Sequence, residues 1–401
     1  MAQKNSILRS ERAGISRFVR EMTSALVMAL VFIVYVIQAF KIPSASMEKS
    51  LLTGDFLLGL KFLYGSPLVP FSYAKFPHFT DPGPGDVVIF EFPGNDFDIG
   101  NSSFLNKDFI KRCVAGPGQV VEVKGRDLFI DGKKFVLPPR GQFVRNGELD
   151  YPEITSFAPL RIPQKGDTIA VDSLDARGFF FLRNLIEQEN PGSRLTKFWT
   201  GTVQPVARGL PLLRNFLSQR PRDNPELAQS FPAVAMDFSI YFDGKKTDTV
   251  SIMASDPFGQ QRAVSFPYLK RQIVVNLNDS RIASWLLLEK PLDFLLDKLR
   301  ENFPGRDIAI KKELYLKGKR VSRYIVKNDN YFMMGDNRDD SMDSRYWGYL
   351  NRNFVKAKAF ILYFSLDGET PWWRLPFKIR WKRMGKLIRS WNGLEPPGYY
   401  K

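Results

Sequence analysis

The chain has 401 residues, of which 44% are hydrophobic and 25% charged, which suits one large or two ordinary folded domains and argues against disorder throughout. The formal net charge of +16 indicates an anionic partner, either nucleic acid or a membrane surface. Because Cys113 and His78 are single residues of their kinds, the sequence excludes an internal disulfide and a cysteine-based zinc site, and a histidine-based protease would have to use His78.

The first predicted element is a membrane-spanning helix at residues 22–40. No charged residue lies between Glu21 and Lys41, and at about 1.5 Å per residue this run just crosses a hydrocarbon core of about 30 Å. A cleavable signal peptide is the alternative, but its apolar region is usually only about 7–15 residues long, and residues 37–39 match a small-residue cleavage site poorly. Since basic residues predominate in residues 1–21, we expect this tail in the cytoplasm and the rest of the chain outside it.

The elements that follow are mostly predicted strands. Residues 64–85 are rich in Pro, Gly and aromatic side chains and predict an irregular ribbon. Strands are predicted at 56–60, 86–92 and 107–114, two hairpins at 119–135 with turns at 124–126 and 131–132, and further strands at 313–318, 322–336 and 357–366. Between them, residues 139–325 mix strand-like pieces at 238–244 and 272–279 with a helical stretch at 280–303 that Pro291 divides. The pattern predicts a mostly β core with a large insertion.

Two serines, Ser44 and Ser46, follow Pro43 directly after the apolar run. Residues two apart in an extended or turning backbone face the same side, so both hydroxyl groups can serve one site. Serine after proline is also common in ordinary turns, so this segment alone does not establish catalysis.

Lys111 interrupts an otherwise apolar predicted strand, where it shares a face with Phe109 and Cys113. Removing water from a lysine lowers its pKa below the usual value of about 10.4, and a neutral amine is a competent general base. The alternative is a lysine at a strand edge whose ammonium group reaches water.

The segment 336–345 contains four Asp, two Arg and two Ser residues. Such a composition predicts an ordered loop held by ion pairs and Asx-type turns. A calcium-binding loop is the alternative, but the central glycine and terminal glutamate of an EF-hand are missing and the arginines would oppose a cation.

Together and in this order, these blocks resemble bacterial type I signal peptidases, which are serine proteases with a Ser/Lys dyad. The chain reads PSASM…LLTGD, GDVVIF, DFIKRCVAGPGQ and GDNRDDSMDSRYWG where that family has P-S-x-S-M…G-D, GDVVIF, Y-I-K-R-x-x-G-x-P-G-D and G-D-N-R-D-x-S-x-D-S-R-Y-W-G. The resemblance covers the anchor and about residues 24–63, 85–135 and 324–365. It departs at Glu48-Lys49-Ser50, at Gln119 and at Cys113, whose oxidation would inhibit the enzyme if the thiol faces the Lys111 amine.

The resemblance implies a role for each candidate site residue. Ser46 is implied to be the nucleophile and Lys111 its general base, with Ser44 adding a hydroxyl group to the oxyanion hole. The residues implied to orient the lysine and hold the site are Ser341, Asp343, Arg345 and Asp336, with Arg338 in support. The residues implied to line small apolar subsites are Phe40, Ile42, Met47, Leu51 and Ile110. No metal or cofactor is implied.

The expected fold is mostly β: an N-terminal transmembrane helix precedes a β-rich, signal-peptidase-type catalytic core that a large second domain interrupts. The predicted boundaries are a basic cytoplasmic tail at 1–21, the helix at 22–40, the first part of the core at 41–138, the inserted domain at 139–325, the second part of the core at 326–367, and a basic aromatic tail at 368–401. That tail combines Trp with Lys and Arg, which is typical of the lipid headgroup zone, or of an amphipathic helix that packs on the domain.

The resemblance implies a membrane-anchored endopeptidase that removes signal peptides from exported preproteins. We expect a single-pass protein of the cytoplasmic (inner) membrane with its catalytic domain on the outer, periplasmic side. Its expected partners are preprotein signal peptides and the lipid bilayer, but not nucleic acid. The alternatives are an inactive membrane-anchored binding or scaffold protein on the same fold, and a Ser-Lys autoprotease of the SOS-repressor kind, for which we find no helix-turn-helix segment.

Overall fold

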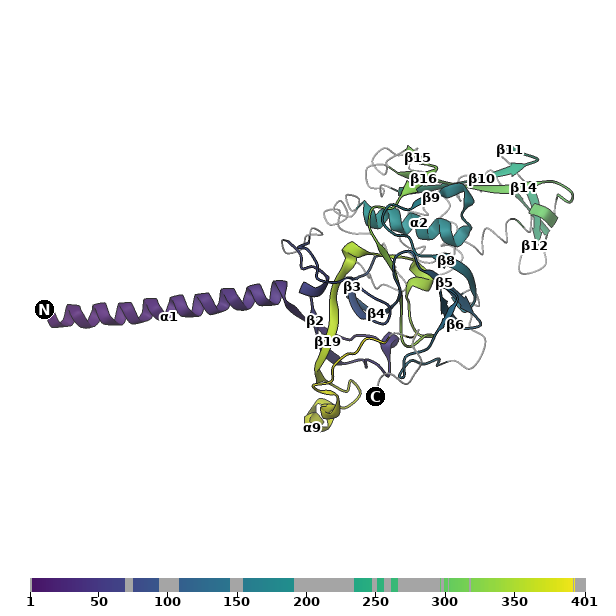
Figure 1. Cartoon of the computed structure of the whole chain (residues 1–401). Coiled ribbons are helices and arrows are strands. Elements are labelled where there is room, and N and C mark those ends of the chain that lie inside the picture. Colours follow the sequence, from purple (N-terminus) through teal and green to yellow (C-terminus); the bar gives the residue numbers. More distant parts are fainter. Residues whose placement is uncertain are drawn as a thin grey trace.

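Helix α1 (Ala2–Tyr35) projects from a β-rich body in the computed structural model (Figure 1). The structure describes residues 2–68, 75–93, 108–144, 154–190, 234–246, 251–255, 261–265, 296, 299–301, 303–316, 319–391 and 393. The segment Arg17–Tyr35 has a mean hydropathy of 1.7 and none of it is buried inside the protein. It is therefore long and apolar enough to cross a membrane, as the sequence predicts.

The helix ends at Tyr35, and the predicted end at residue 40 is wrong because the residues that follow join a sheet. Strand β1 (Ile37–Lys41) pairs antiparallel with β2 (Asp55–Leu60), with Ile37 opposite Leu60. A short apolar run suits a helix or a strand, and here the pairing with β2 decides between them. Ser66 Oγ donates to Tyr35 O, and Lys61 N donates to Val36 O, so the end of the helix is tied to the domain.

A seven-stranded antiparallel sheet forms the centre of the core, with the strand order β1-β2-β19-β3-β4-β17-β18. Its other members are β3 (Val87–Glu91), β4 (Asp108–Ala115), β17 (Asn330–Met334), β18 (Leu350–Asn351) and β19 (Val355–Ser365). Strand β19 pairs with both β2 and β3, and β17 pairs with β4. Strands from before and after the insertion therefore alternate in one sheet, and the predicted mostly β core is confirmed.

A second sheet has the order β7-β6-β5-β8 and contains the two predicted hairpins. Its strands are β5 (Val120–Lys124), β6 (Asp127–Ile130), β7 (Lys133–Phe135) and β8 (Phe157–Arg161). In the second turn Asp131 and Gly132 have φ values of 51° and 75°, the left-handed pair that a tight hairpin requires.

The described part of the predicted insertion contains helix α2 (Ala176–Glu189), which the sequence pattern does not predict. Buried polar residues interrupt its apolar face and so obscure the helical periodicity. Besides β8, the described strands of this region are β9 (Thr168–Ala170), β10 (Val234–Phe242), β11 (Lys245–Lys246), β12 (Ser251–Ser255), β13 (Gln261–Ser265), β14 (Ile308–Leu316), β15 (Lys319–Val321) and β16 (Arg323–Ile325). The strand-like pattern at 272–279 and most of the helical pattern at 280–303 lie outside the described residues.

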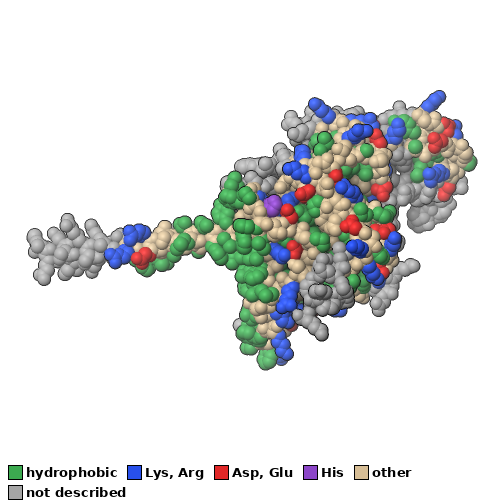
Figure 2. All heavy atoms as spheres, in the orientation of Figure 1, with side chains coloured by type: hydrophobic (Ala, Val, Ile, Leu, Met, Phe, Trp, Pro, Cys, Tyr) green, Lys and Arg blue, Asp and Glu red, His purple; other side chains and the backbone are tan. Residues whose placement is uncertain are grey.

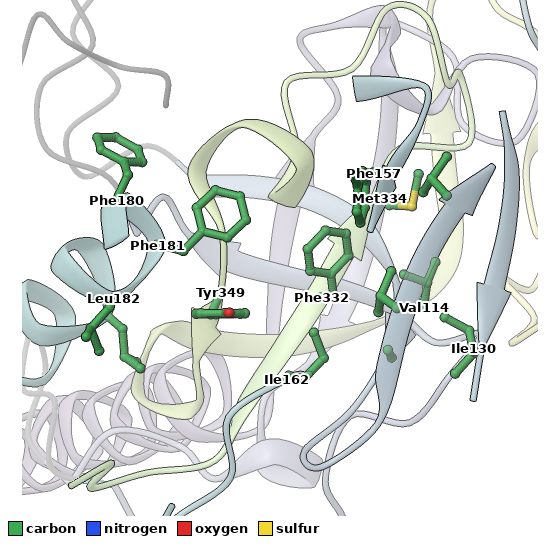
Figure 3. Packing of buried hydrophobic residues seen from close by; sticks show 14 of the residues in the cluster. Val114, Ile130, Phe157, Ile162, Phe180, Phe181, Leu182, Phe332, Met334 and Tyr349 are labelled. Atoms are coloured by element: carbon green, nitrogen blue, oxygen red, sulfur yellow. The ribbon is translucent and has the colours of Figure 1, made fainter. Parts of the chain in front are cut away.

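The largest hydrophobic cluster joins α2 to the core strands (Figure 3). Phe181 and Leu182 of α2 pack in the same cluster as Phe332 of β17, Val114 of β4 and Ile130 of β6. The cluster therefore contains residues from the insertion and from both halves of the core, and these parts are stabilised by one shared apolar surface.

The C-terminal segment folds across the core as short helical turns and extended chain. The turns are Trp372–Arg374, α9 (Leu375–Lys378) and Trp381–Arg383. Leu387 bridges to Ile361 of β19, and the Arg383 guanidinium lies 2.5 Å from the buried Asp55 carboxylate. A long amphipathic helix, one of the two structures considered for this tail, is therefore wrong for its described part.

Replacing Gly54 by Ala is expected to destabilise the core more than the same change at Gly132. Both residues have positive φ values, 89° and 75°, so each substitution incurs about 1–2 kcal/mol of backbone strain. At Gly54 a Cβ would also overlap the Leu366 carbonyl oxygen, whereas at Gly132 nothing lies within 4 Å. Denaturant unfolding of both variants in detergent measures the difference, and equal losses would contradict the assignment of this close backbone approach.

Candidate active site

Ser46 and Lys111 lie in contact although they are far apart in the chain. Ser46 belongs to a 3-10 turn (Ala45–Met47), and Lys111 lies in β4. The Lys111 Nζ atom is 2.5 Å from Ser46 Oγ. Ser46 is 7% exposed and Lys111 4%, so the two groups meet in a site that is nearly closed to water.

Burial lowers the pKa of Lys111 to about 8, and the positive charge of Arg345 acts in the same direction. The carboxylates of Asp343, Asp336 and Asp340 oppose this shift without cancelling it. The amine therefore loses its proton far more readily than an ordinary lysine, and its neutral form can accept a proton from the neighbouring hydroxyl group.

Ser44 stands beside the dyad at the start of the same turn. Its Oγ lies 3.4 Å from Ser46 Oγ, and its backbone is extended, with φ −133° and ψ 162°. The first N–H groups of a helical turn have no acceptor within the turn. The Ser46 N–H and the Ser44 hydroxyl are thus suited to bind a negatively charged oxygen next to the nucleophile.

Residues 335–337 hold the 3-10 turn that carries Ser46, which we call the nucleophile turn. Asn337 N donates to Ser46 O over 3.1 Å, and Asn337 Nδ2 donates to Ala45 O over 3.1 Å. Asp336 N donates to Met47 Sδ over 3.3 Å. A Cβ on Gly335 would lie 2.5 Å from Ser46 O, so only glycine permits this close approach.

Two buried ion pairs hold the loop at residues 336–345, which we call the acidic loop. One of them joins Asp343 and Arg345, two of the predicted site residues. Arg345 Nε lies 2.8 Å from Asp343 Oδ1, and Gly335 N donates to Asp343 Oδ2 over 3.0 Å. Burial alone would raise the pKa of Asp343, but Arg345 holds it below its ordinary value. The other pair joins Asp336 to Arg112, over 2.8 and 2.6 Å. The carboxylates of both aspartates are thus bound to arginines, so the loop is held by ion pairs.

Arg112 and Gln142 are site residues that the sequence analysis missed. Asp336 is bound by Arg112, whereas Arg338 contributes its backbone carbonyl, which accepts from Arg345 Nη2 over 2.5 Å. Gln142 N donates to Asp336 O, and Gln142 O accepts from Arg338 N. The Lys-Arg pair in the IKR segment was the available signal, since neighbouring residues of a strand face opposite sides and the arginine needs its own buried partner.

Ser341 lies at the site but does not bond the lysine in the described structure. It is 6% exposed and lies against Gly335. No hydrogen bond joins its hydroxyl group to the Lys111 amine among the described residues. Its role in orienting the amine stays a prediction.

The residues predicted to line apolar subsites form one cluster but differ in exposure. Ile42, Met47 and Leu51 are each at most 2% exposed and pack inside the core, so they lie beneath the surface. Phe40 and Ile110 are partly buried and pack on the same cluster. Only the latter two therefore keep surface that a substrate can touch.

Cys113 and His78 lie in different settings. Cys113 is 0% exposed in a second cluster with Phe90 and Trp347, and burial raises the pKa of its thiol, so the reactive thiolate is disfavoured. Burial therefore disfavours oxidation of this thiol in the folded chain, and the effect of its oxidation on the site stays a prediction. His78 lies on the surface, where its Nε2 is 3.2 Å from Asp81 Oδ2.

Comparison with known proteins shows the family to which this chain is similar. The family described as "Signal peptidase, peptidase S26" matches residues 15–184 and 240–364. The chain belongs to this signal peptidase family. Members of this S26 family are membrane-anchored serine peptidases that process signal peptides. The gap between the matched ranges lies within the predicted insertion, and it is narrower than residues 139–325.

Some S26 relatives match most of the chain, and others match a shorter stretch at higher identity. Signal peptidase I of Buchnera aphidicola subsp. Schizaphis graminum is 24% identical over 360 residues, covering 89% of this chain and 78% of the relative. Signal peptidase I of Aquifex aeolicus is 22% identical and covers 86% of this chain and 82% of the relative. Signal peptidase I of Pseudomonas fluorescens is 38% identical over 109 residues, which are 27% of this chain and 35% of the relative.

Replacing Lys111 by Met is expected to stabilise the fold at neutral pH. The folded chain holds the pKa of Lys111 at about 8 against a value of 10.5 for a free lysine, so the unfolded state binds more protons between these values and stability rises with pH through that window. The Lys111→Met variant lacks this pH dependence. Its free energy of unfolding is expected to exceed that of the parent by roughly 3 kcal/mol below pH 8, and this difference is expected to vanish above about pH 10.5. Denaturant unfolding of both proteins across this range measures it, and a constant difference would contradict the lowered pKa.

Proposed function

We propose that this chain is an active endopeptidase that cleaves signal peptides from exported preproteins, with Ser46 as its nucleophile and neutral Lys111 as its general base. The contact of 2.5 Å between the two groups, in a site closed to water, carries the proposal. An inactive scaffold on this fold would have no need of a buried amine beside a serine, because burying an ionisable group opposes folding.

The reaction follows from the positions of these groups. Lys111 Nζ takes the proton of the Ser46 hydroxyl group as Oγ attacks the scissile carbonyl carbon. The oxyanion that forms is bound by the Ser46 N–H and the Ser44 hydroxyl group, and donors of this kind are worth roughly 3–4 kcal/mol each in other proteases. The Lys111 ammonium then gives its proton to the leaving amine, which departs and leaves an acyl-enzyme. Water attacks the ester with Lys111 again as base, and the new carboxylate and free Ser46 result.

The remaining polar residues act as supports in this proposal. Asp343 and Arg345 hold the loop that carries Ser341, and Asp336 with Arg112 holds the segment that binds the nucleophile turn. The Ser341 hydroxyl group is assigned to orient the Lys111 amine once the substrate is bound.

Two free strand edges offer a path for the substrate. Strand β1 is at the end of its sheet, and the first half of β4, up to Lys111, pairs with β3 alone among the described strands. An extended peptide can add to such edges by backbone hydrogen bonds, with its side chains against Phe40 and Ile110. Small residues such as Ala before the cleaved bond suit the shallow surface that these two side chains leave.

Replacing Ser46 or Lys111 by Ala is expected to abolish cleavage of a preprotein by the detergent-solubilised chain, because each change removes one reacting group. His78→Ala is the matched control, and it is expected to retain the parent activity since His78 lies on the surface beside Asp81. Gel analysis of preprotein processing measures all three. Full activity of either alanine variant, or its loss in the histidine variant, would defeat the Ser/Lys mechanism.

We further propose that the chain crosses the cytoplasmic membrane once, with its catalytic domain resting on the outer face of the bilayer. Hydrophobic side chains gather on the domain where α1 leaves it and along the face that continues toward α9 (Figure 2). Phe79, whose ring meets that of Phe62, is 80% exposed, and Trp373, Phe377 and Trp381 of the C-terminal segment are 68%, 82% and 61% exposed. Exposed aromatic residues interspersed with Lys and Arg suit the headgroup zone.

Quenching of tryptophan fluorescence by brominated lipids tests this orientation. The full chain in vesicles is expected to show quenching that the double change of Trp373 and Trp381 to Phe reduces, because these side chains would reach the acyl boundary. Trp347→Phe is the control, since this side chain is 1% exposed and therefore has almost no surface that lipid can touch in any orientation of the folded domain. Equal quenching in the parent and the double variant would contradict the proposed contact.

A further inference from the structure

Helix α2 contacts residues 347–351, which follow the acidic loop at 336–345. It does so through side chains that the proposed chemistry does not use. Asn184 Nδ2 donates to Trp347 O over 3.0 Å, and Gln188 Nε2 donates to Tyr349 O over 2.8 Å. Gln188 Oε1 also accepts from Asn351 N over 2.8 Å. Both amide side chains are buried, at 5% and 2% exposure, although amides are costly to bury without such partners.

Close packing at Gly348, which lies between Trp347 and Tyr349, adds to these hydrogen bonds. Gly348 has a φ of 87°, and a Cβ there would lie 2.7 Å from the Phe181 ring of α2. The Phe181 ring also meets the Tyr349 ring edge-on, with centroids 5.6 Å apart (Figure 3). Helix α2 therefore holds the backbone of residues 347–351 by hydrogen bonds and by close aromatic contact.

The braced segment is continuous with the groups that surround the dyad. Gly348 N donates to Ser344 O, and Trp347 N donates to Asp343 O, which closes the short helix α8 (Ser344–Trp347). The Asp343 side chain caps this helix and also accepts from Gly335 N, and Gly335 lies against Ser46 O. Residues 347–349 are thus connected through α8 and Asp343 to the walls of the site.

We propose that Gln188 and Asn184 are positioning residues for the peptidase reaction: through α2 they fix the loop that closes the dyad from water. The inference rests on the proposed function. Gln188 lies beyond residue 184, where the first range of the family match ends, so this part of the insertion adds a support that the family pattern does not cover. On this proposal, helix α2 of the insertion is part of the structure that catalysis requires.

The proposal predicts a fall in kcat at unchanged KM when Gln188 is replaced by Leu in the full chain. Loosening the loop is expected to lower kcat about tenfold, because it disturbs groups that act in the transition state and leaves the substrate edges intact. Asn184→Ala, which removes one hydrogen bond to residues 347–351 together with the bond that Asn184 Oδ1 accepts from Arg183 Nη1, is expected to act in the same direction. Asn190→Ala is the matched control: its amide lies at the end of the same helix, where Nδ2 donates to Ile186 O and Tyr324 Oη and Oδ1 accepts from Lys327 Nζ.

A second readout follows the protonation of Lys111 without using catalysis. In a Ser46→Ala background, the rate at which an amine-reactive reagent labels Lys111 is measured by mass spectrometry as a function of pH. The groups facing this amine are Asp343, Arg345, Asp336 and Asp340, and burial is the largest influence on it. Admitting water is therefore expected to move the labelling midpoint to higher pH in Gln188→Leu but not in Asn190→Ala.

The outcomes separate the two proposals. A parent-like kcat and labelling midpoint in Gln188→Leu, or equal changes in Asn190→Ala, would overturn the positioning role. If the parent shows no cleavage that depends on Ser46, the proposed function fails, while the labelling experiment still decides whether α2 controls the setting of Lys111.

Discussion

The removal of water from one lysine amine is the condition on which the rest of this structure depends. A lysine in water keeps its proton at neutral pH and cannot accept another from a serine. In this chain the nucleophile turn, strand β4 and the acidic loop come from three distant parts of the sequence and meet around Nζ of Lys111. Burial is costly for such a group, so the surrounding fold must be stable enough to hold it in place.

The charges near the dyad illustrate how this cost is limited. Arg112 with Asp336 and Arg345 with Asp343 are buried as matched pairs, and each pair has a further backbone partner: Arg112 donates to Gly85 O, and Asp343 accepts from Gly335 N. Such pairs contribute little net stability, but breaking one is expensive, on the order of 3–5 kcal/mol, because a charge is left alone in the interior. The loop is therefore held in one geometry, and the amine stays beside groups whose opposite charges largely cancel.

Sequence reasoning succeeded where the signal was local. The hairpins were readable because Asp131 and Gly132 suit a left-handed turn, and the dyad was readable because Ser46 and Lys111 sit in characteristic short blocks. It failed where tertiary pairing decides the outcome. The apolar residues after Tyr35 became a strand through β2, and the partner of Asp336 proved to be Arg112, which no spacing in the sequence could indicate.

Helix α2 was missed for a related reason. Asn184 and Gln188 are polar, and a reader of the sequence expects such residues to face solvent, whereas here they bond the backbone of another segment. The same is true of the apolar set assigned to the substrate, since periodicity cannot distinguish Met47, which is fully buried, from Ile110, which keeps some exposed surface.

The direct passage from α1 into β1 has a geometric consequence. The strand that leaves the anchor is also the sheet edge that leads to Ser46, and contacts of Tyr35 and Val36 with residues 61–66 secure the junction. In the membrane placement proposed above, the distance between the nucleophile and the bilayer is set by this rigid connection and not by a flexible linker. An enzyme anchored in this way would select peptide bonds by their distance from the lipid as well as by their side chains.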